Sequence, residues 1–253
     1  MKPVIGVIGG VGPYAGLDFV RNIFDNTRAV TDQEHLNTVL ISCPSLIPDR
    51  TDFLLNKHDE KDNPAYGMFA CAKMLYDAGA RFVTVACNTA HAAPIFGPYS
   101  AMVAEKLPGL TIVNMLETCA SYVREALGFT RIGLLATRGT HVSGVYREYF
   151  KAAEGITLLE PDNEEQEAVH DLIYNKEYGI KAHSSPVSPR AKETLSKAIL
   201  TLAGRGAEAV VLGCTELPLA VEKKADFPLP LLNPALIAAR RLITLADPGK
   251  LAG

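Results

Sequence analysis

The sequence predicts an α/β fold of two pseudo-symmetric three-layer αβα domains, each with a mainly parallel sheet. Strand-like apolar runs alternate with helical patterns in both halves of the 253-residue chain, which is typical of parallel sheets covered by helices. The offset that carries Cys87 onto Cys214 also superimposes the apolar runs that end at these cysteines, and it places residues 5–8 on residues 132–135. One offset that relates a strand and a cysteine in both halves indicates an internal repeat, and we call it the repeat offset.

The first half is expected to begin with a β-branched run, a glycine-rich turn and a helix. Apolar periodicity and turn residues then place the remaining elements of this half. The expected strands are 3–8, 38–42, 81–86 and 112–114, and the expected helices are 14–27, 65–78 and 90–107. The connection to the second half, around Glu117, is expected to be short.

The second half is expected to repeat this order. Its strands are predicted at 131–136, 156–159 and 208–213, and its helices at 143–152, 164–176, 188–204 and 234–246. Leu231-Leu232-Asn233 resembles Ile112-Val113-Asn114 at a slightly smaller offset, which a deletion in the second half explains. We expect the last helix to pack on the first half, so that the domains are 1–115 plus 225–253, and 116–224.

Composition narrows the class of protein. With 48% hydrophobic and 21% charged residues and a net charge of −3, the chain is globular and has no basic footprint for nucleic acid. No apolar run approaches the ~18 residues of a membrane span, so we expect a cytoplasmic protein without a membrane partner. The five cysteines lack a Cys-x-x-Cys spacing, so neither disulfides nor a metal site is expected. Cys43, Cys71 and Cys119 are interpreted as small buried apolar residues.

The turn after the first strand, Gly10-x-Gly12-x-x-Ala15, matches the dinucleotide-binding fingerprint. That fingerprint needs an acidic residue at the end of the second strand to hold a ribose hydroxyl, but this strand ends in Ser42-Cys-Pro-Ser45. We therefore expect no nicotinamide cofactor. Backbone N–H groups of such a turn, here around Gly12 and Pro13, bind a carboxylate equally well.

Cys87-Asn88-Thr89 and Cys214-Thr215-Glu216 each place a thiol at a strand end before a helical segment. Unpaired N–H groups there attract a carboxylate and lower a thiol's pKa from about 8.5 toward neutrality. Pseudo-symmetric halves would bring the two thiols to one cleft from opposite sides. Two such thiols suit proton transfer at carbon, one removing a Cα proton and the other delivering one to the opposite face. The alternative is a disulfide switch.

Four segments together resemble the aspartate/glutamate racemase family, in its aspartate racemase branch: residues 5–13, 86–91, 135–140 and 206–217. The resemblance covers nearly the whole chain. It implies a racemase without a cofactor, with an active site in the cleft between two similar α/β domains, a small amino-acid substrate and a homodimer. Cys87 would act on the D-enantiomer and Cys214 on the L-enantiomer.

The resemblance also implies roles for neighbouring residues. Asn88, Thr89 and Thr215 would hold the substrate's α-carboxylate and amino group, with Thr137 and Thr140 lining the second-half side. Arg50 matches an arginine that binds a substrate carboxylate, for which its fork is suited; the alternative is a solvated loop charge. His91 is interpreted as a packing or capping histidine.

One segment departs from the aspartate branch. Members of that branch carry a lysine after an Ile-Tyr pair; here Ile173-Tyr174 is followed by Lys176 in a segment one residue shorter, which leaves Lys181 as the rival. Glu216 stands where the glutamate branch has histidine, which favours aspartate.

The sequence therefore predicts a racemase without pyridoxal phosphate that interconverts L- and D-aspartate, or else glutamate or a broader set of amino acids. The alternatives are a cis–trans isomerase or decarboxylase of small dicarboxylates, and a non-catalytic amino-acid sensor. A sensor would keep Arg50 and the glycine turn but would not need two thiols.

Overall fold

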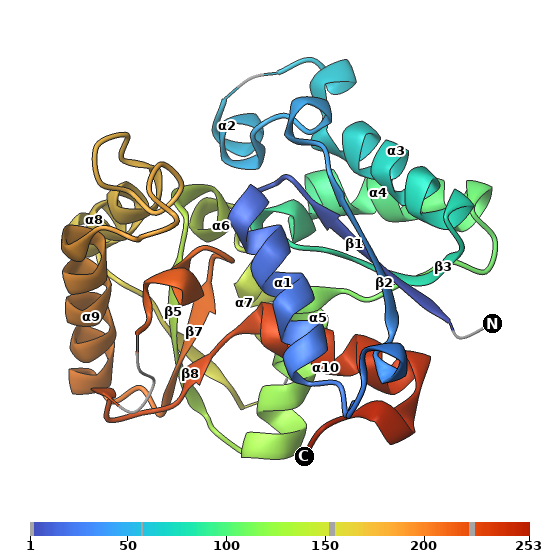
Figure 1. The fold of residues 1–253 in the computed structure, drawn as a ribbon. Coiled ribbons are helices and arrows are strands. Elements are labelled where there is room, and N and C mark those ends of the chain that lie inside the picture. Colours follow the sequence, from blue (N-terminus) through green and yellow to red (C-terminus); the bar gives the residue numbers. More distant parts are fainter. Residues whose placement is uncertain (1–2, 57, 152–154, 223–225) are drawn as a thin grey trace. The chain divides into compact units, whose positions relative to one another are not determined.

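The computed structural model describes residues 3–56, 58–151, 155–222 and 226–253 (Figure 1). The chain divides into two compact units, a first unit formed by Met1–Thr118 and Ala235–Gly253, and a second unit formed by Cys119–Pro234. The predicted domain boundary between residues 224 and 225 lies outside the described residues. Each unit is described by itself below.

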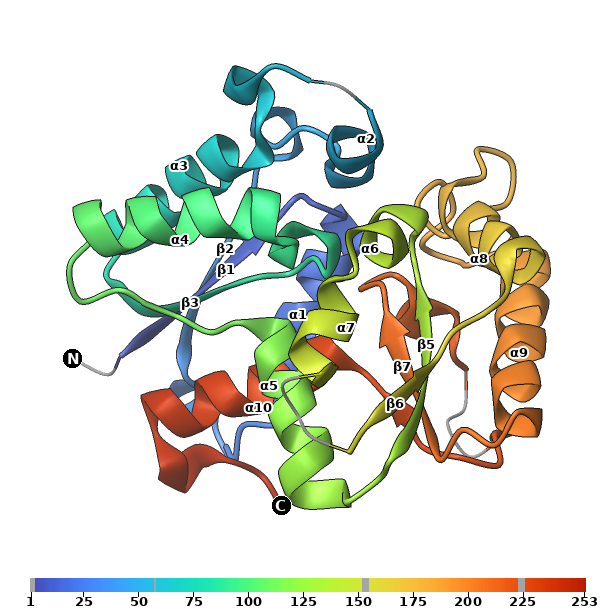
Figure 2. The same cartoon turned by 180° about the vertical axis from the view of Figure 1, so that it is seen from behind.

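Among its described residues, the first unit contains a parallel sheet of four strands in the order β2-β1-β3-β4. The strands are β1 (Val4–Gly9), β2 (Asn37–Ser42), β3 (Ala80–Val85) and β4 (Thr111–Ile112). The helices are α1 (Pro13–Asp25), α2 (Arg50–Leu55), α3 (Pro64–Asp77), α4 (Ala93–Lys106) and α10 (Pro234–Ala246). Figures 1 and 2 show α3 and α4 on one face of this sheet and α1 and α10 on the other.

The second unit has the equivalent sheet, with the strand order β6-β5-β7-β8 in the part that the structure describes. The strands are β5 (Arg131–Ala136), β6 (Thr157–Leu159), β7 (Ala209–Gly213) and β8 (Leu231–Leu232). The helices are α6 (Arg138–Ser143), α7 (Val145–Lys151), α8 (Asn163–Tyr174) and α9 (Pro189–Gly204). Helices α8 and α9 cover one face of this sheet, and α7 lies on the other (Figure 2). The predicted α/β fold with two parallel sheets is confirmed.

The repeat extends to the register of the strands. Ile5 pairs with Phe82 in the first sheet and Ile132 pairs with Ala209 in the second, so the repeat offset relates both members of the pair. The edge strands β4 and β8 are paired in equivalent ways, since Val83 pairs with Ile112 and Val210 pairs with Leu231. The carboxyl ends of β3 and β7 therefore occupy equivalent positions within their sheets.

Most of the elements expected from the sequence are present within one to three residues of their predicted bounds, and β5 has the bounds predicted for it. The helix predicted at 143–152 corresponds to α7, but the sequence did not predict the separate helix α6 before it. Two helices, α6 and α7, meet at Gly144, whose positive φ of 67° ends α6. Residue 152 lies outside the described residues.

The short connection expected around Glu117 is wrong. This residue lies in α5 (Met115–Tyr122), which continues as a wider helical turn to Leu127. Helix α2 was not predicted either.

The end of the chain packs on the first half, as the sequence indicates. Arg240 of α10 donates a hydrogen bond to the side chain of Asn26 at 2.8 Å, and Thr27 forms an antiparallel bridge with Leu251. In the described part of the chain, no helix is long and apolar enough to cross a membrane.

Candidate active site

The two predicted catalytic cysteines follow equivalent strands of the two sheets. Cys87 lies two residues after β3 and Cys214 lies directly after β7. Both side chains are nearly buried, since the residues are 6% and 5% exposed. Ligands of parallel α/β sheets bind at the carboxyl ends of the strands, so Cys87 and Cys214 both lie where such a fold places its chemistry.

The segment after β3 is fixed by His91. Its Nδ1 donates to the carbonyl oxygen of Cys87 at 2.8 Å, and its Nε2 accepts the backbone N–H of Met115 at 3.2 Å. Because Nε2 is an acceptor, the ring is neutral with its proton on Nδ1. Burial lowers the pKa of His91 to about 4, and the ring stacks on Phe96. The interpretation of His91 as a packing and capping residue is confirmed.

Asn88 and Thr89 follow Cys87 and are also buried. Asn88 precedes a short 3-10 helix, Thr89–His91, whose last N–H bonds back to the carbonyl oxygen of Asn88 at 3.0 Å. This tight segment holds both predicted substrate-binding residues beside the thiol.

The glycine turn after β1 lies against the end of β2. Gly10 has a positive φ of 77°, and a Cβ there would lie 2.7 Å from the backbone nitrogen of Cys43, so only glycine fits. Gly12 is half-buried, and Pro13, which is exposed, begins α1.

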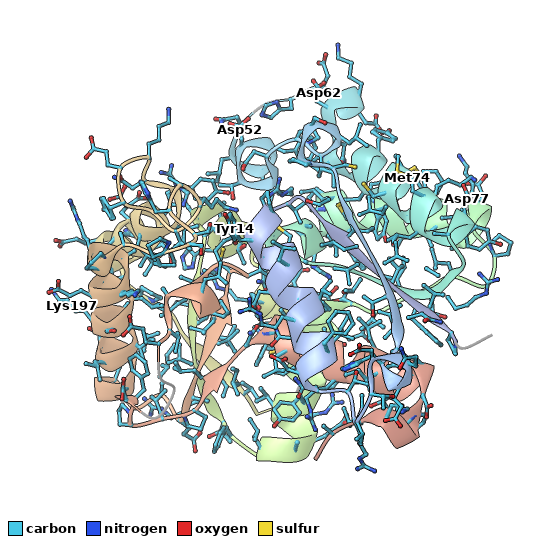
Figure 3. All side chains as sticks on the ribbon, viewed as in Figure 1. Tyr14, Asp52, Asp62, Met74, Asp77 and Lys197 are labelled. Atoms are coloured by element: carbon cyan, nitrogen blue, oxygen red, sulfur yellow. The ribbon has the colours of Figure 1, made fainter. Side chains whose placement is uncertain are left out.

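Arg50 joins this turn to α2. Its Nη2 donates to the carbonyl oxygen of Val11 at 2.6 Å, and its Nη1 donates to that of Pro48 at 3.1 Å. Arg50 is only 7% exposed, which excludes the solvated loop charge considered above. Helix α2 contacts the Thr89–His91 segment, so the first unit brings Arg50, the glycine turn and the Cys87 segment together. The labels Tyr14 and Asp52 in Figure 3 locate the first turn of α1, which follows the glycine turn, and helix α2, which begins with Arg50.

In the second unit, two threonines stand where the first unit has its glycine turn. The repeat offset relates Gly10 to Thr137 and Pro13 to Thr140. Thr137 caps α6 by accepting the N–H of Thr140 at 3.2 Å, and the two hydroxyl oxygens lie 3.0 Å apart. Both residues are buried, and Thr137 directly follows β5, whose carboxyl end lies at the same sheet edge as Cys214.

Cys214 belongs to a buried cluster of polar side chains. Its thiol donates to Oε2 of Glu216, with 3.0 Å between sulfur and oxygen, and the hydroxyl of Thr215 donates to the same oxygen at 3.3 Å. Burial and the charge of Glu216 raise the pKa of Cys214 well above its ordinary value. The expected lowering of the pKa by local N–H groups is therefore wrong for this cysteine.

Lys181, rather than Lys176, belongs to this cluster. Its Nζ lies 2.5 Å from Oε1 of Glu216 and 5.4 Å from the centre of the Tyr174 ring. Lys176 is exposed in the turn after α8. Of the two lysines considered from the sequence, Lys181 is therefore the one whose charge acts on Cys214.

Two residues near these groups carry no recognisable sequence signal. Gln166 of α8 donates from Nε2 to the carbonyl oxygen of Ala136, the last residue of β5, at 2.9 Å. Tyr146 of α7 is buried, and burial together with the charges of Cys119 and Cys214 raises its pKa well above the ordinary value. Only tertiary packing brings them to this sheet edge.

The other cysteines lie in less polar surroundings. Cys71 and Cys119 are fully buried, and burial raises their thiol pKa values to about 11 and about 12. Cys43 is half-buried, which corrects its interpretation as a buried residue. All five cysteines are free thiols. Within the described ranges, no group of three or more His, Cys, Asp or Glu side chains is arranged to hold a metal ion.

A comparison with known protein families agrees with the sequence motifs, the two equivalent sheets, and the positions of Cys87 and Cys214. The profile of the Asp/Glu/Hydantoin racemase family matches residues 8–242 of this chain. The chain belongs to this family. The matched residues span both units and include Cys87 and Cys214.

Solved structures of racemases share the fold. The structure of an aspartate racemase from Picrophilus torridus superposes with a TM-score of 0.82 at 27% identity, covering 99% of this chain and 96% of that one. The structure of a putative Asp/Glu racemase from Yersinia pestis has a TM-score of 0.72 at 25% identity, covering 96% and 99% of the two chains.

Curated relatives include glutamate racemases. The one from Roseiflexus sp. is 32% identical over 156 residues, or 60% of this chain and 50% of the relative. The one from Symbiobacterium thermophilum is 29% identical over 171 residues, or 67% and 52%. The matches thus span about half the length of these curated relatives. The family therefore includes similar proteins that are named for two different substrates.

Proposed function

We propose that this chain is a cofactor-independent amino-acid racemase that interconverts L- and D-aspartate, with glutamate as the second candidate. The observation that carries the proposal is the equivalence of Cys87 and Cys214, which follow β3 and β7 in two sheets of identical order and related register. A racemase needs two acid–base groups, one for each face of the Cα atom, whereas a protein that only binds an amino acid does not need two thiols.

In the proposed reaction, Cys87 as thiolate removes the Cα proton of the D-enantiomer. Its sulfur gains that proton, and the electron pair of the Cα–H bond is delocalised into the α-carboxylate. Cys214 as thiol then delivers a proton to the opposite face, which gives the L-enantiomer. The return reaction exchanges the two roles.

The weak acidity of the Cα–H bond is the main barrier, so groups that stabilise charge on the carboxylate matter most. We assign this role to the N–H groups of the glycine turn, to Asn88 and Thr89, and to Arg50, which the first unit gathers around Cys87. Thr137, Thr140 and Thr215 would hold the substrate from the second unit.

Aspartate is favoured by the similarity to the Picrophilus torridus enzyme over nearly the whole chain, and by Glu216 at the position where the glutamate branch carries histidine. The curated glutamate racemases support the second candidate, although over a shorter part of the chain.

The test is proton NMR in deuterated water, with each enantiomer of aspartate and of glutamate and no added cofactor. We expect loss of the Cα–H signal of aspartate and formation of the opposite enantiomer on a chiral column. Cys87→Ser and Cys214→Ser should abolish net racemisation, whereas Cys71→Ala, which removes a thiol from the core of α3, should retain it.

Exchange with glutamate alone would assign the second candidate. Binding of either amino acid without exchange, unchanged in both serine variants, would replace the proposal with a sensor. Formation of a product that differs from the substrate in more than its chirality would indicate a cis–trans isomerase or a decarboxylase.

A further inference from the structure

The Glu216 carboxylate accepts hydrogen bonds from Cys214, Thr215 and Lys181 while it is nearly excluded from water. The thiol of Cys214 and the hydroxyl of Thr215 share Oε2, and the ammonium of Lys181 lies on Oε1. Glu216 is 2% exposed. A buried carboxylate of this kind keeps its charge only when donors and a cation compensate for the lost water. Lys181 supplies that cation, so Glu216 is an ionised acceptor.

The charge on Glu216 determines which form of Cys214 is stable. A thiol donates a hydrogen bond to a carboxylate, whereas a thiolate at the same place would be a second negative charge 3.0 Å from Oε2. Among the described residues of its own unit, the titratable groups whose charge or hydrogen bonding is coupled to Cys214 include Glu216, Lys181 and Tyr146. Burial and Glu216 act against the thiolate, and Lys181 acts in its favour.

We propose that Glu216, with Lys181 as its counter-ion, is a positioning residue that holds Cys214 as a protonated thiol and so makes it the proton donor of the resting enzyme. This inference rests on the proposed racemase function. The resting enzyme is then poised for the D-enantiomer. Cys87 takes the Cα proton, the S–H bond of Cys214 breaks as a new Cα–H bond forms, and the S–H electron pair stays on sulfur.

The thiolate formed in this step lies beside Glu216 and is destabilised by it. Cys214 therefore recovers a proton before another D-enantiomer reacts. It takes the Cα proton of the next L-enantiomer while Cys87 delivers its own proton to the opposite face, or it takes a proton from water while Cys87 releases its proton to water. The carboxylate thus makes the thiolate of Cys214 a strong base when it forms, while Lys181 limits the cost of forming it.

The direct test measures the protonation of Cys214 in the full chain. Iodoacetamide reacts with the thiolate, so the rate of alkylation of Cys214 against pH, followed by peptide mass spectrometry, reports its titration. In the wild type, we expect the midpoint to lie above the ordinary thiol range. In Glu216→Gln, which keeps the shape and removes the charge, the midpoint should fall by about one pH unit or more.

Two further variants separate charge from structural damage. Glu222→Gln removes the same charge from an exposed Lys192–Glu222 ion pair in the same unit and should leave the midpoint unchanged. The single variant Glu216→Gln leaves the charge of Lys181 without its partner, which can destabilise the fold. The double variant Glu216→Gln/Lys181→Gln replaces the ion pair by two neutral side chains and should therefore fold even if the single variant does not. Its midpoint should lie below that of the wild type and above that of Glu216→Gln.

The proposal is overturned by a Cys214 midpoint that does not move in Glu216→Gln and the double variant, or that moves equally in Glu222→Gln. The alkylation readout does not depend on substrate, so it distinguishes this failure from failure of the proposed function. The rate of Cα–H exchange in deuterated water should decline at high pH in both proteins. In Glu216→Gln this decline should begin at a lower pH than in the wild type, which a purely structural role of Glu216 would not cause.

Discussion

The Cδ1 atom of Leu75 lies 3.1 Å from the position that a Cβ atom on Gly6 would take, and Leu202 stands in the same relationship to Gly133, also at 3.1 Å. The repeat offset carries the first pair onto the second. Helices α3 and α9 therefore pack directly on the backbones of β1 and β5, at the central strands of their sheets. The two units share not only their topology but also the contact that sets the distance from helix to strand.

Gly133→Ala should destabilise the protein by about 2 kcal/mol because its Cβ would also lie 2.9 Å from Val210. Gly6→Ala should cost less, since its nearest contacts are 3.1 Å or longer. Gly204→Ala, at the last residue of α9, is the matched control: a Cβ there meets nothing within 4 Å, so it should stabilise the helix by up to about 1 kcal/mol. Urea unfolding monitored by circular dichroism measures all three. A Gly133→Ala variant as stable as wild type would show that Leu202 and Val210 yield freely.

The sequence was sufficient to predict the strands and their repeat, because β-branched runs and turn glycines are local signals. The run ending at Cys214 is buried on both faces of its sheet, as a central parallel strand requires. Its equivalence to the run ending at Cys87 follows from a single offset along the chain. Both thiols were thus placed at strand ends without any tertiary information.

The environment of Cys214 was not predictable in the same way. Lys181 and Glu216 are 35 residues apart, and no periodic pattern links them. Local N–H groups favour a thiolate there, but burial and the carboxylate act more strongly in the opposite direction. Helix α2 did have a local signal, since Asp49 caps it by accepting the N–H of Asp52 at 2.8 Å. The helix is short, and its apolar periodicity is correspondingly weak.

Acid should weaken the fold through His91. Its pKa is about 4 in the folded protein, against 6.5 for an ordinary histidine, because it is buried as a neutral ring. The unfolded chain therefore binds a proton that the folded chain excludes between these values. The free energy of unfolding should fall as the pH drops from about 6.5 to about 4, by on the order of 3 kcal/mol from this group.

The measurement is urea unfolding at several pH values, comparing wild type with His91→Gln. The variant should be less stable at neutral pH, and its difference from wild type should shrink toward pH 4. His183→Gln, which changes an exposed histidine, should give a curve parallel to that of wild type. A constant difference between wild type and His91→Gln would contradict the assignment of this pH dependence to His91.

Thr137→Ala should destabilise the second unit by about 1 kcal/mol, since it removes the cap that accepts the N–H of Thr140. Thr137→Ser retains the hydroxyl and should recover most of that loss in thermal unfolding. Under the proposed function, the alanine variant should also slow Cα–H exchange, because the start of α6 would no longer be held at the end of β5. Equal stability of the alanine and serine variants would argue against the cap.

Arg50→Lys should lower both stability and activity, although the charge is retained. The guanidinium bridges the carbonyl oxygens of Val11 and Pro48, and a single ammonium cannot span both. Loss of one hydrogen bond to a charged group corresponds to about 2 kcal/mol. Exchange of the aspartate Cα proton should slow at least tenfold, with the KM rising, because the glycine turn and the proposed carboxylate contact depend on the same fork. Arg124→Lys, in an exposed pair with Glu125, should change stability by less than about 0.5 kcal/mol. An Arg50→Lys variant that matches the Arg124→Lys variant in stability would show that the two carbonyl contacts do not hold the turn in place.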